Sequence, residues 1–200
     1  MAASCGHPVN INTIDRMNAQ QMPPSALPGS EKKKQESRDA QKVLRLLAKK
    51  LKPLGFERTK PTFFTRSGRY VLEFVHVHKF TFGPIFRIHF GVRVRSDEFA
   101  AAHLNGPDSD SIQDPEMPGR QRYDFSYGPS ESSWESCSEA MFQCVSSEGI
   151  DWFALLANPT TLLASNSPLT QSAMTALQRE LKDPLCAVAS EASKRALNAV

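Results

Sequence analysis

Residues 69–95 carry the pattern that most limits how this chain can fold, RYVLEFVHVHKFTFGPIFRIHFGVRVR. This stretch indicates two long β-strands joined by a turn into an antiparallel hairpin. An even-length turn around Phe82-Gly83 places Phe80 opposite Ile85. Because strand side chains alternate between faces, this register gathers apolar residues on one face. The pairs expected on that face are Val77 with Ile88, Val75 with Phe90 and Val71 with Val94.

The opposite face of the hairpin carries polar and aromatic side chains in the same register. Its expected pairs are His76 with His89, His78 with Arg87, Phe74 with Gly91 and Leu72 with Arg93. An aromatic ring that covers a cross-strand glycine is a known stabilising device of β-sheets. Glu73 falls on the apolar face, and it is the residue that counts against this register.

A helix is expected over residues 38–54, where apolar residues recur at three- and four-residue steps and form one stripe. Pro53 and Gly55 predict its end. Another face of this helix carries a basic row, which is expected to be solvated. That row consists of Lys42, Arg45, Lys49 and Lys52.

Two further strands are expected to extend the sheet. Residues 62–65 form a short strand, and Ser67-Gly68 is a candidate two-residue turn into the long hairpin. Residues 120–127 alternate enough to predict a fourth strand. The turn at Ser67-Gly68 sets Phe64 opposite Val71 and Phe63 opposite Leu72.

Helices are expected over residues 133–147, 151–157 and 171–181, with Ser133 as a cap and Gly149 as a break after the first of them. The fold class is therefore α+β: one N-terminal helix packed on a four-stranded antiparallel sheet, followed by C-terminal helices.

Composition divides the chain into three parts. Residues 1–37 are polar, proline-containing and then charged, and are expected to be a disordered tail. Residues 38–182 are expected to form a single α+β domain. Residues 183–200 are an Ala-rich C-terminal segment that is weakly amphipathic and expected to be partly helical.

The sequence favours a cytoplasmic protein. No apolar run approaches the 18 or so residues of a membrane-spanning helix, and no basic segment followed by an apolar one marks a signal peptide. The cysteines show no C-x-x-C spacing and are expected to be reduced thiols. They are Cys5, Cys137, Cys144 and Cys186.

The net charge of +3 conceals an asymmetry along the chain. Residues 31–95 contain 17 Lys or Arg against 5 Asp or Glu, whereas residues 96–200 contain 6 against 15. The basic part could attract phosphate or an acidic partner. The simpler interpretation, that the two halves complement each other within one fold, is favoured.

The order of motifs resembles a bacterial family, domain of unknown function 4304, over about residues 38–165. The similarity rests on a basic helix that ends in LKPLGF, on TFFTR, on the strands VLEFVHVHK and FRIHFGVRV, on a Trp-led helix and on DWF. The resemblance implies a small α+β domain with an antiparallel sheet. It implies no established activity, so no catalytic residue can be carried over.

The polar face of the hairpin is the candidate binding site. Arginine suits phosphate or carboxylate through its planar fork, and exposed aromatic rings on a sheet can stack bases. An anionic ligand or a nucleic acid is therefore one alternative, although a solvated face is the simpler explanation. The candidate ligand-binding residues are Phe74, His76, His78, Arg87, His89 and Arg93.

The same face offers a second alternative, a metal-dependent enzyme that uses His76, His78 and His89. Three imidazoles on one sheet face with an open fourth position suit catalytic zinc. Arg87 beside His78 opposes a bound cation, and Glu73 lies on the wrong face to orient a ligand. The favoured expectation is that no cofactor is required.

Motifs for other catalytic chemistry are lacking in the sequence. No G-x-S-x-G, P-loop or G-x-G-x-x-G occurs. The leading hypothesis is a cytosolic, non-catalytic protein-binding or accessory module of the immunity type, whose partner is another protein. Nucleic acid is a less favoured partner, a membrane is excluded, and the oligomeric state is open.

Overall fold

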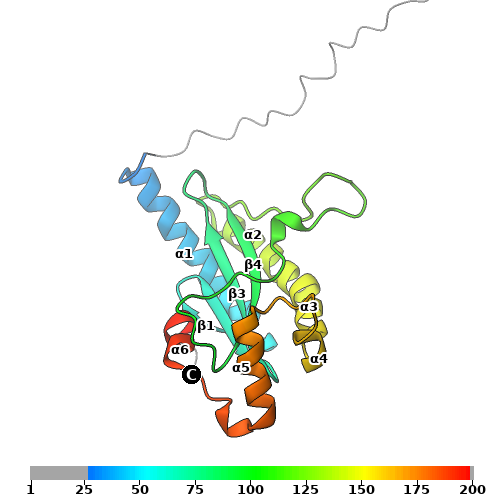
Figure 1. Cartoon of the computed structure of the whole chain (residues 1–200). Helices are drawn as coiled ribbons and strands as arrows, with labels where there is room; N and C mark the ends of the chain where they lie inside the picture. The colour runs from blue at the N-terminus through cyan, green and yellow to red at the C-terminus, as the bar shows by residue number, and fades with distance from the viewer. Residues whose placement is uncertain (1–26, 199–200) are drawn as a thin grey trace, which may run out of the picture.

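The computed structural model describes residues 27–198, in which a long helix precedes a four-stranded sheet and further helices follow (Figure 1). The strand order is β1-β2-β3-β4, and every neighbouring pair is antiparallel. The predicted α+β fold class is therefore confirmed. The elements are α1 (Glu31–Leu51), β1 (Glu57–Lys60), β2 (Phe63–Ser67), β3 (Val71–Lys79), β4 (Phe86–Val94), α2 (Glu131–Cys144), α3 (Ile150–Leu155), α4 (Pro159–Leu162), α5 (Gln171–Lys182) and α6 (Glu191–Leu197).

Helix α1 begins seven residues earlier than the sequence predicted. Ser30 caps it, because its side-chain oxygen accepts a hydrogen bond from the backbone N–H of Lys33 at 3.3 Å. Residues 31–37, which were expected to belong to the disordered tail, are therefore helical. Residues 1–26 of that expected tail lie outside the described residues. The buried apolar stripe of α1 consists of Ala40, Val43, Leu44, Leu47 and Leu51.

The register predicted for the long hairpin is confirmed by the pairing of β3 with β4. Phe80 donates its backbone N–H to the carbonyl of Ile85 at 3.1 Å, so four residues form the turn. Phe74 lies opposite Gly91, and a β-carbon on that glycine would overlap the Phe74 ring. The structure also contains the other six predicted pairs, which are Val77 with Ile88, Val75 with Phe90, Val71 with Val94, His76 with His89, His78 with Arg87 and Leu72 with Arg93.

The register predicted for β2 is wrong by four residues. Phe64 lies opposite Val75 and Phe63 lies opposite His76, because four residues rather than two connect β2 to β3 after the pair Ser67–Leu72. A shift by an even number leaves every side chain on its predicted face. Phe64 therefore still points to the apolar side.

The fourth strand is not where the sequence placed it. Residues 120–127 make only isolated bridges, Ile85 with Ser126 and Gln113 with Gln121. The Asp124 carboxylate accepts hydrogen bonds from the backbone N–H and the hydroxyl of Ser126, and this local turn competes with a strand ladder. The remaining strand of the sheet is instead β1, an edge strand that pairs with β2 and contains a bulge between Arg58 and Lys60.

The inner face of the sheet packs against α1, α2 and α3 and forms the main core. Glu73 is buried there, as its register required, and Arg66 on the neighbouring strand neutralises it with Nε 2.5 Å from the carboxylate. The Arg66 guanidinium also lies 4.6 Å from the centre of the Phe56 ring. This pairing explains how the core accommodates a carboxylate.

Residues 131–155 form one continuous helical path rather than two helices separated at Gly149. Ser130 caps α2, and the Ser133 hydroxyl, the predicted cap, instead accepts a hydrogen bond from the Gly128 N–H. A π-helical segment over Val145–Gly149 connects α2 to α3. Gly149 permits close packing, because a β-carbon there would lie 2.6 Å from the Phe90 ring.

The last two α-helices differ in what they cover: α5 contributes Ala173 and Leu177 to the main core, whereas α6 packs on the outer face of the sheet. The first part of the Ala-rich segment interrupts the helical path after Lys182, and α6 then returns to the outer face of the sheet (Figure 1). Within the described part of the chain, no helix combines the length and apolar character that a membrane crossing requires.

We predict that Gly91→Ala lowers the free energy of unfolding by about 3 kcal/mol, because the added methyl group collides with Phe74 in a close-packed site. Urea unfolding measures this loss. Combining Gly91→Ala with Phe74→Leu should cost at least about 1 kcal/mol less than the two single losses added together. The control is Gly83→Ala in the same hairpin, where nothing lies within 4 Å of an added β-carbon. Equal losses at Gly91 and Gly83 would contradict the proposed contact.

Candidate functional site

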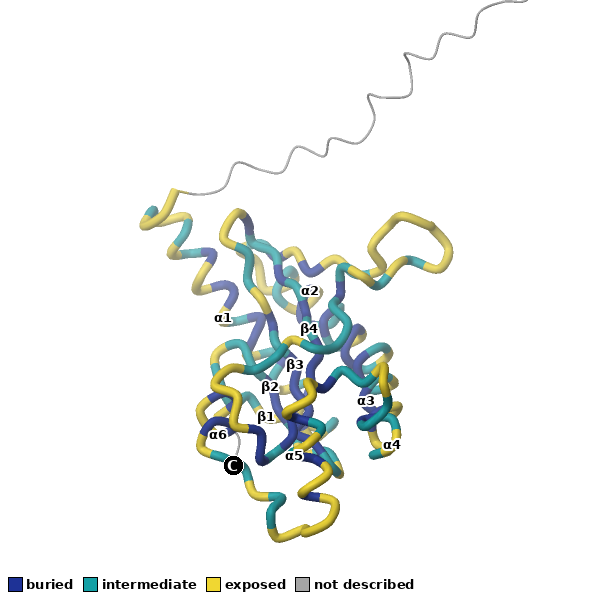
Figure 2. The backbone as a smooth tube through the Cα atoms, in the orientation of Figure 1, coloured by how far each residue is buried: buried dark blue, intermediate teal, exposed yellow. Residues whose placement is uncertain are grey.

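The outer face of the sheet is divided into a covered half and an open half. The covered half contains Leu72 and Phe74, which pack against Ala196 and Leu197 of α6. Phe74 has no exposed surface, so it cannot stack on a ligand. The expectation that Phe74 belongs to a binding site is corrected accordingly. Figure 2 shows the buried strands beneath the C-terminal segments on this side.

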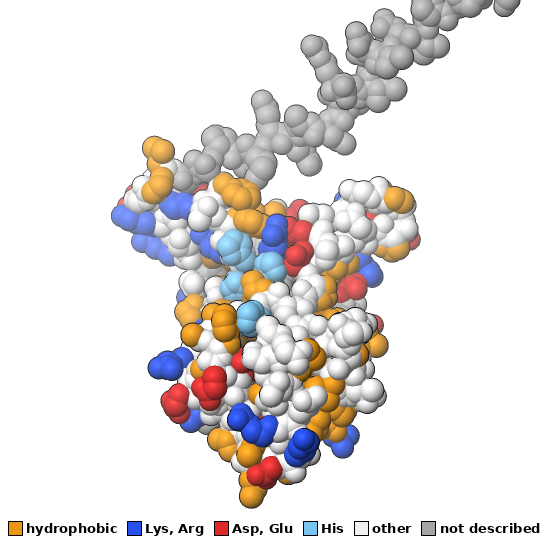
Figure 3. Space-filling view, viewed as in Figure 1, with side chains coloured by type: hydrophobic (Ala, Val, Ile, Leu, Met, Phe, Trp, Pro, Cys, Tyr) orange, Lys and Arg blue, Asp and Glu red, His pale blue; other side chains and the backbone are white. Residues whose placement is uncertain are grey.

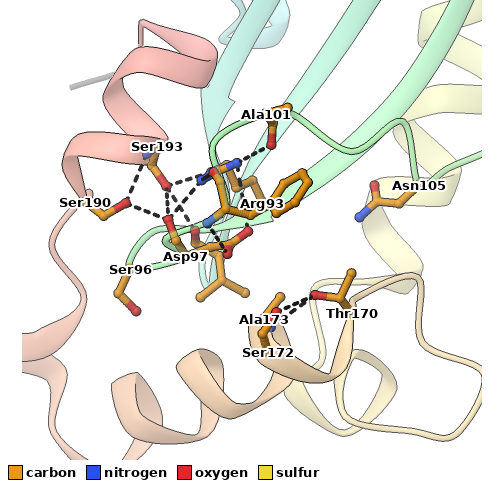
Figure 4. Close-up of polar contacts among 12 residues, drawn as sticks. Arg93, Ser96, Asp97, Ala101, Asn105, Thr170, Ser172, Ala173, Ser190 and Ser193 are labelled. Atoms are coloured by element: carbon orange, nitrogen blue, oxygen red, sulfur yellow. Dashed lines mark hydrogen bonds and ion pairs between the residues drawn. The ribbon is translucent and has the colours of Figure 1, made fainter.

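Arg93 is the second sequence-predicted site residue that the fold removes from the surface. Its side chain is 3% exposed, and its guanidinium donates four hydrogen bonds (Figure 4). Nε donates to the Ser193 hydroxyl at 2.7 Å, which connects β4 to α6. Nη1 donates to the carbonyl of Ala101, and Nη2 donates to the carbonyls of Asp97 and Phe99, at 2.6–2.9 Å. Arg93 therefore holds the loop over residues 97–101 and helix α6 against β4. Because these internal hydrogen bonds engage its guanidinium, Arg93 is not available to bind an external anion.

The open half of the outer face carries the remaining predicted residues. We call this surface the histidine patch. His78 and Phe82 are exposed, and the other members are half-buried. Figure 3 shows imidazole side chains gathered on this face of the molecule beside basic, acidic and hydrophobic groups. The members of the histidine patch are Phe63, His76, His78, Phe80, Phe82, Arg87 and His89.

The rings of the histidine patch contact one another in a continuous series. His76 lies between Phe63, with ring centres 4.5 Å apart, and His89, with ring centres 6.0 Å apart and planes inclined by only 25°. His78 meets Phe80 edge to face at 5.1 Å, and Phe80 contacts Phe82 at 4.7 Å. Tilted and edge-to-face contacts of this kind are favourable arrangements for aromatic rings, so each ring supports its neighbour.

Arg87 is held at the edge of the histidine patch by two interactions. Its guanidinium forms an ion pair with the Asp110 carboxylate and lies 5.0 Å from the centre of the Phe80 ring. The Ser109 hydroxyl accepts a hydrogen bond from the backbone N–H of Ile88, and this contact holds the acidic turn against β4. Arg87 is therefore positioned and largely neutralised.

Reasoning from the sequence missed the acidic neighbours and part of the aromatic series. Asp108 caps a short 3₁₀ turn over Ser109–Ser111, and its backbone forms an isolated β-bridge with His89. The Asp-x-Asp-x pattern is an available signal for such a capped turn. Phe63 was assigned the correct face but the wrong cross-strand partner, so its contact with His76 was not foreseen.

Burial keeps two of these imidazoles neutral near pH 7. Burial lowers the pKa of His76 to about 4, and the neighbouring charges of His89 and His78 act in the same direction. Burial also lowers the pKa of His89, against the opposing influence of the Asp108 carboxylate. The His76 Nδ1 atom and the Arg87 Nε atom are buried without a hydrogen-bond partner. His76 and His89 thus present neutral rings, beside polar atoms that lack hydrogen-bond partners.

The patch does not have the arrangement of a metal centre. The structure brings His76, His78 and His89 onto one surface, yet among residues 27–198 no three His, Cys, Asp or Glu side chains converge on a point where an ion could bind. This arrangement does not support the alternative of a zinc-dependent enzyme that uses these three histidines. Glu73, which could have oriented a ligand, lies on the inner face beside Arg66.

The described cysteines offer no activated nucleophile at this surface. Cys137 and Cys144 are buried in the core, and burial raises the pKa of each thiol to about 12. A protonated thiol in the core is unreactive. These two residues therefore act as small apolar core side chains.

Comparison with protein-family models, curated proteins and solved structures gave no match in any of the three searches. The resemblance to domain of unknown function 4304 therefore remains a prediction from the sequence motifs.

We predict that the buried His76 makes the fold sensitive to acid. The unfolded imidazole binds a proton below about pH 6.5, whereas the folded one stays neutral until about pH 4, so protonation favours the unfolded state between these values. The free energy of unfolding should fall between pH 7 and pH 4.5 by about 2 kcal/mol more in the wild type than in His76→Gln. Urea unfolding at the two pH values measures the difference. Equal losses in both proteins would contradict the burial of this imidazole.

Proposed function

We propose that this chain is a non-catalytic binding module whose histidine patch contacts another protein. The observation that carries the proposal is the composition of the open half-face: aromatic rings, three imidazoles and one arginine whose charge Asp110 offsets. Aromatic residues and arginine are enriched in the energetic centres of protein interfaces, whereas lysine and glutamate are depleted there. An accessory or immunity-type role accords with such a surface.

Phe82 is the best candidate for an anchor residue within the patch. It is 45% exposed at the tip of the β3–β4 hairpin and is supported from behind by Phe80. A large ring that is already held in place loses little conformational freedom when a partner buries it. A complementary partner would offer an apolar pocket for Phe82.

The unsatisfied polar atoms define the second requirement for the partner. His76 Nδ1 and Arg87 Nε lie within the patch without hydrogen-bond partners. Small local movements on binding would allow a polar group of the partner to satisfy them, and an interface that does so gains specificity. The partner should therefore present hydrogen-bonding groups beside its apolar pocket.

Charge argues against nucleic acid as the ligand of this particular surface. Arg93 is buried, and the charge of Arg87 is offset by Asp110, so the patch has no free arginine to contact phosphate. Phe74 is also unavailable for base stacking. A protein partner requires none of these groups.

Photo-crosslinking tests the proposal. A photoreactive phenylalanine analogue at Phe82 should give a discrete protein adduct in extracts of the cells that make this chain, identified by mass spectrometry. Purified partner should then bind Phe82→Ser at least about tenfold more weakly than the wild type, because a central aromatic anchor is lost.

The matched control is Leu155, which is 68% exposed on α3 and lies outside the patch. The analogue at Leu155 should not give the same adduct, and Leu155→Ser should bind like the wild type. Identical adducts from positions 82 and 155, or an adduct with nucleic acid alone, would refute the proposed role of the histidine patch.

A further inference from the structure

A second surface, on the solvent side of α1, carries a row of cations. Arg38, Arg45 and Lys49 recur at steps of seven and four residues, and Lys52 follows at the helix end. These spacings place the four side chains on one side of the helix, opposite its buried stripe. All four are exposed. We call these four residues, with Arg58 of β1, the basic strip.

Arg58 extends the row from the helix to the edge strand. Its guanidinium donates a 3.0 Å hydrogen bond to the Gln41 side chain and also bonds to the Pro61 carbonyl, so it is held against α1. Arg45 is close enough to oppose the charge of Arg58, and this repulsion, together with burial as the larger cause, lowers the pKa of Arg58. Two like charges are thus kept near each other by the fold.

Acidic groups do not offset these charges. Among residues 27–198, none of the five cations of the basic strip forms a salt bridge, whereas the other lysines of α1 that do so pair with Glu31, Glu36, Asp39 or Glu139. Glu57 precedes Arg58 on β1, but neighbouring strand residues point to opposite faces. The strip is therefore a concentrated, uncompensated positive surface.

We propose that the basic strip binds the sugar–phosphate backbone of a nucleic-acid duplex without reading its sequence. The row from Arg38 to Lys52 covers about 21 Å of helix, at a rise of about 1.5 Å per residue. A duplex offers closely spaced phosphates over that length, so several cations can each neutralise one phosphate. Arginine and lysine at this spacing supply the contacts that position a protein on a duplex.

The composition of the strip favours nucleic acid over an acidic protein. Protein interfaces depend on buried aromatic or aliphatic anchors, and the large exposed hydrophobic side chains of the described chain all lie outside α1 and β1. They are Leu27, Phe82, Phe99, Leu104, Met117, Leu155, Leu181, Leu185 and Val188. The absence of exposed aromatic rings on the strip also excludes base stacking there, which favours a duplex over a single strand.

This inference is independent of the proposed protein contact. The basic strip faces solvent from α1, which covers the inner face of the sheet, whereas the histidine patch lies on the outer face. A variant of one surface should leave the other unchanged, so each proposal can fail separately.

Fluorescence anisotropy with the full chain and labelled 20-base-pair DNA and RNA duplexes tests the inference. If three to five phosphates are contacted, the affinity should fall about 40-fold to 500-fold between 50 and 200 mM salt. Duplexes of unrelated sequence should bind equally. The double variant Arg38→Glu, Arg45→Glu should bind at least about tenfold more weakly at 50 mM salt and show a shallower salt dependence.

The control is Arg179→Glu with Lys182→Glu on α5, which changes the net charge by the same amount at two exposed positions away from the strip. This control should bind like the wild type. Equal weakening in both double variants would show a general charge effect and overturn the assigned surface. Absence of duplex binding at 50 mM salt, or equally strong binding of poly-glutamate, would overturn the proposed ligand.

Discussion

The buried guanidinium of Arg93 determines how the outer face of the sheet is organised. A charged group with 3% exposure is tolerated only when its N–H groups are hydrogen-bonded, so the carbonyls of residues 97–101 and the Ser193 hydroxyl must be in place around it. These contacts hold α6 over Leu72 and Phe74. One half of the face becomes core, and the other half is left to the imidazole and aromatic rings.

Much of this arrangement could be predicted from the sequence, because strand alternation is a local property. The even turn at residues 81–84 fixes the β3–β4 register and therefore which side chains share the histidine patch. The apolar stripe of α1 was visible in its three- and four-residue steps. The earlier start of α1 was missed, although Ser30 followed by a charged turn is a capping signal.

The errors arose where long-range contacts decide the outcome. β1 is a short edge strand, ERTK, without apolar alternation, so pairing with β2 rather than its own sequence defines it. Residues 120–127 alternate because Phe125 and Tyr127 are buried, and no ladder accompanies that burial. The burial of Arg93 depends on a serine 100 residues later in the chain. No local pattern reveals that contact, and it changes Arg93 from a candidate ligand into a structural anchor.

The outer face of the sheet is half sealed by α6 and half open to solvent. Hydroxyl-radical footprinting of the intact chain measures this directly, because it compares the solvent access of phenylalanine rings along the same hairpin. Phe82 should be oxidised rapidly and Phe74 should be strongly protected, since they are 45% and 0% exposed. Oxidation of Phe74 at a rate close to that of Phe82 would contradict this arrangement, because α6 would then not shield the covered half of the outer face.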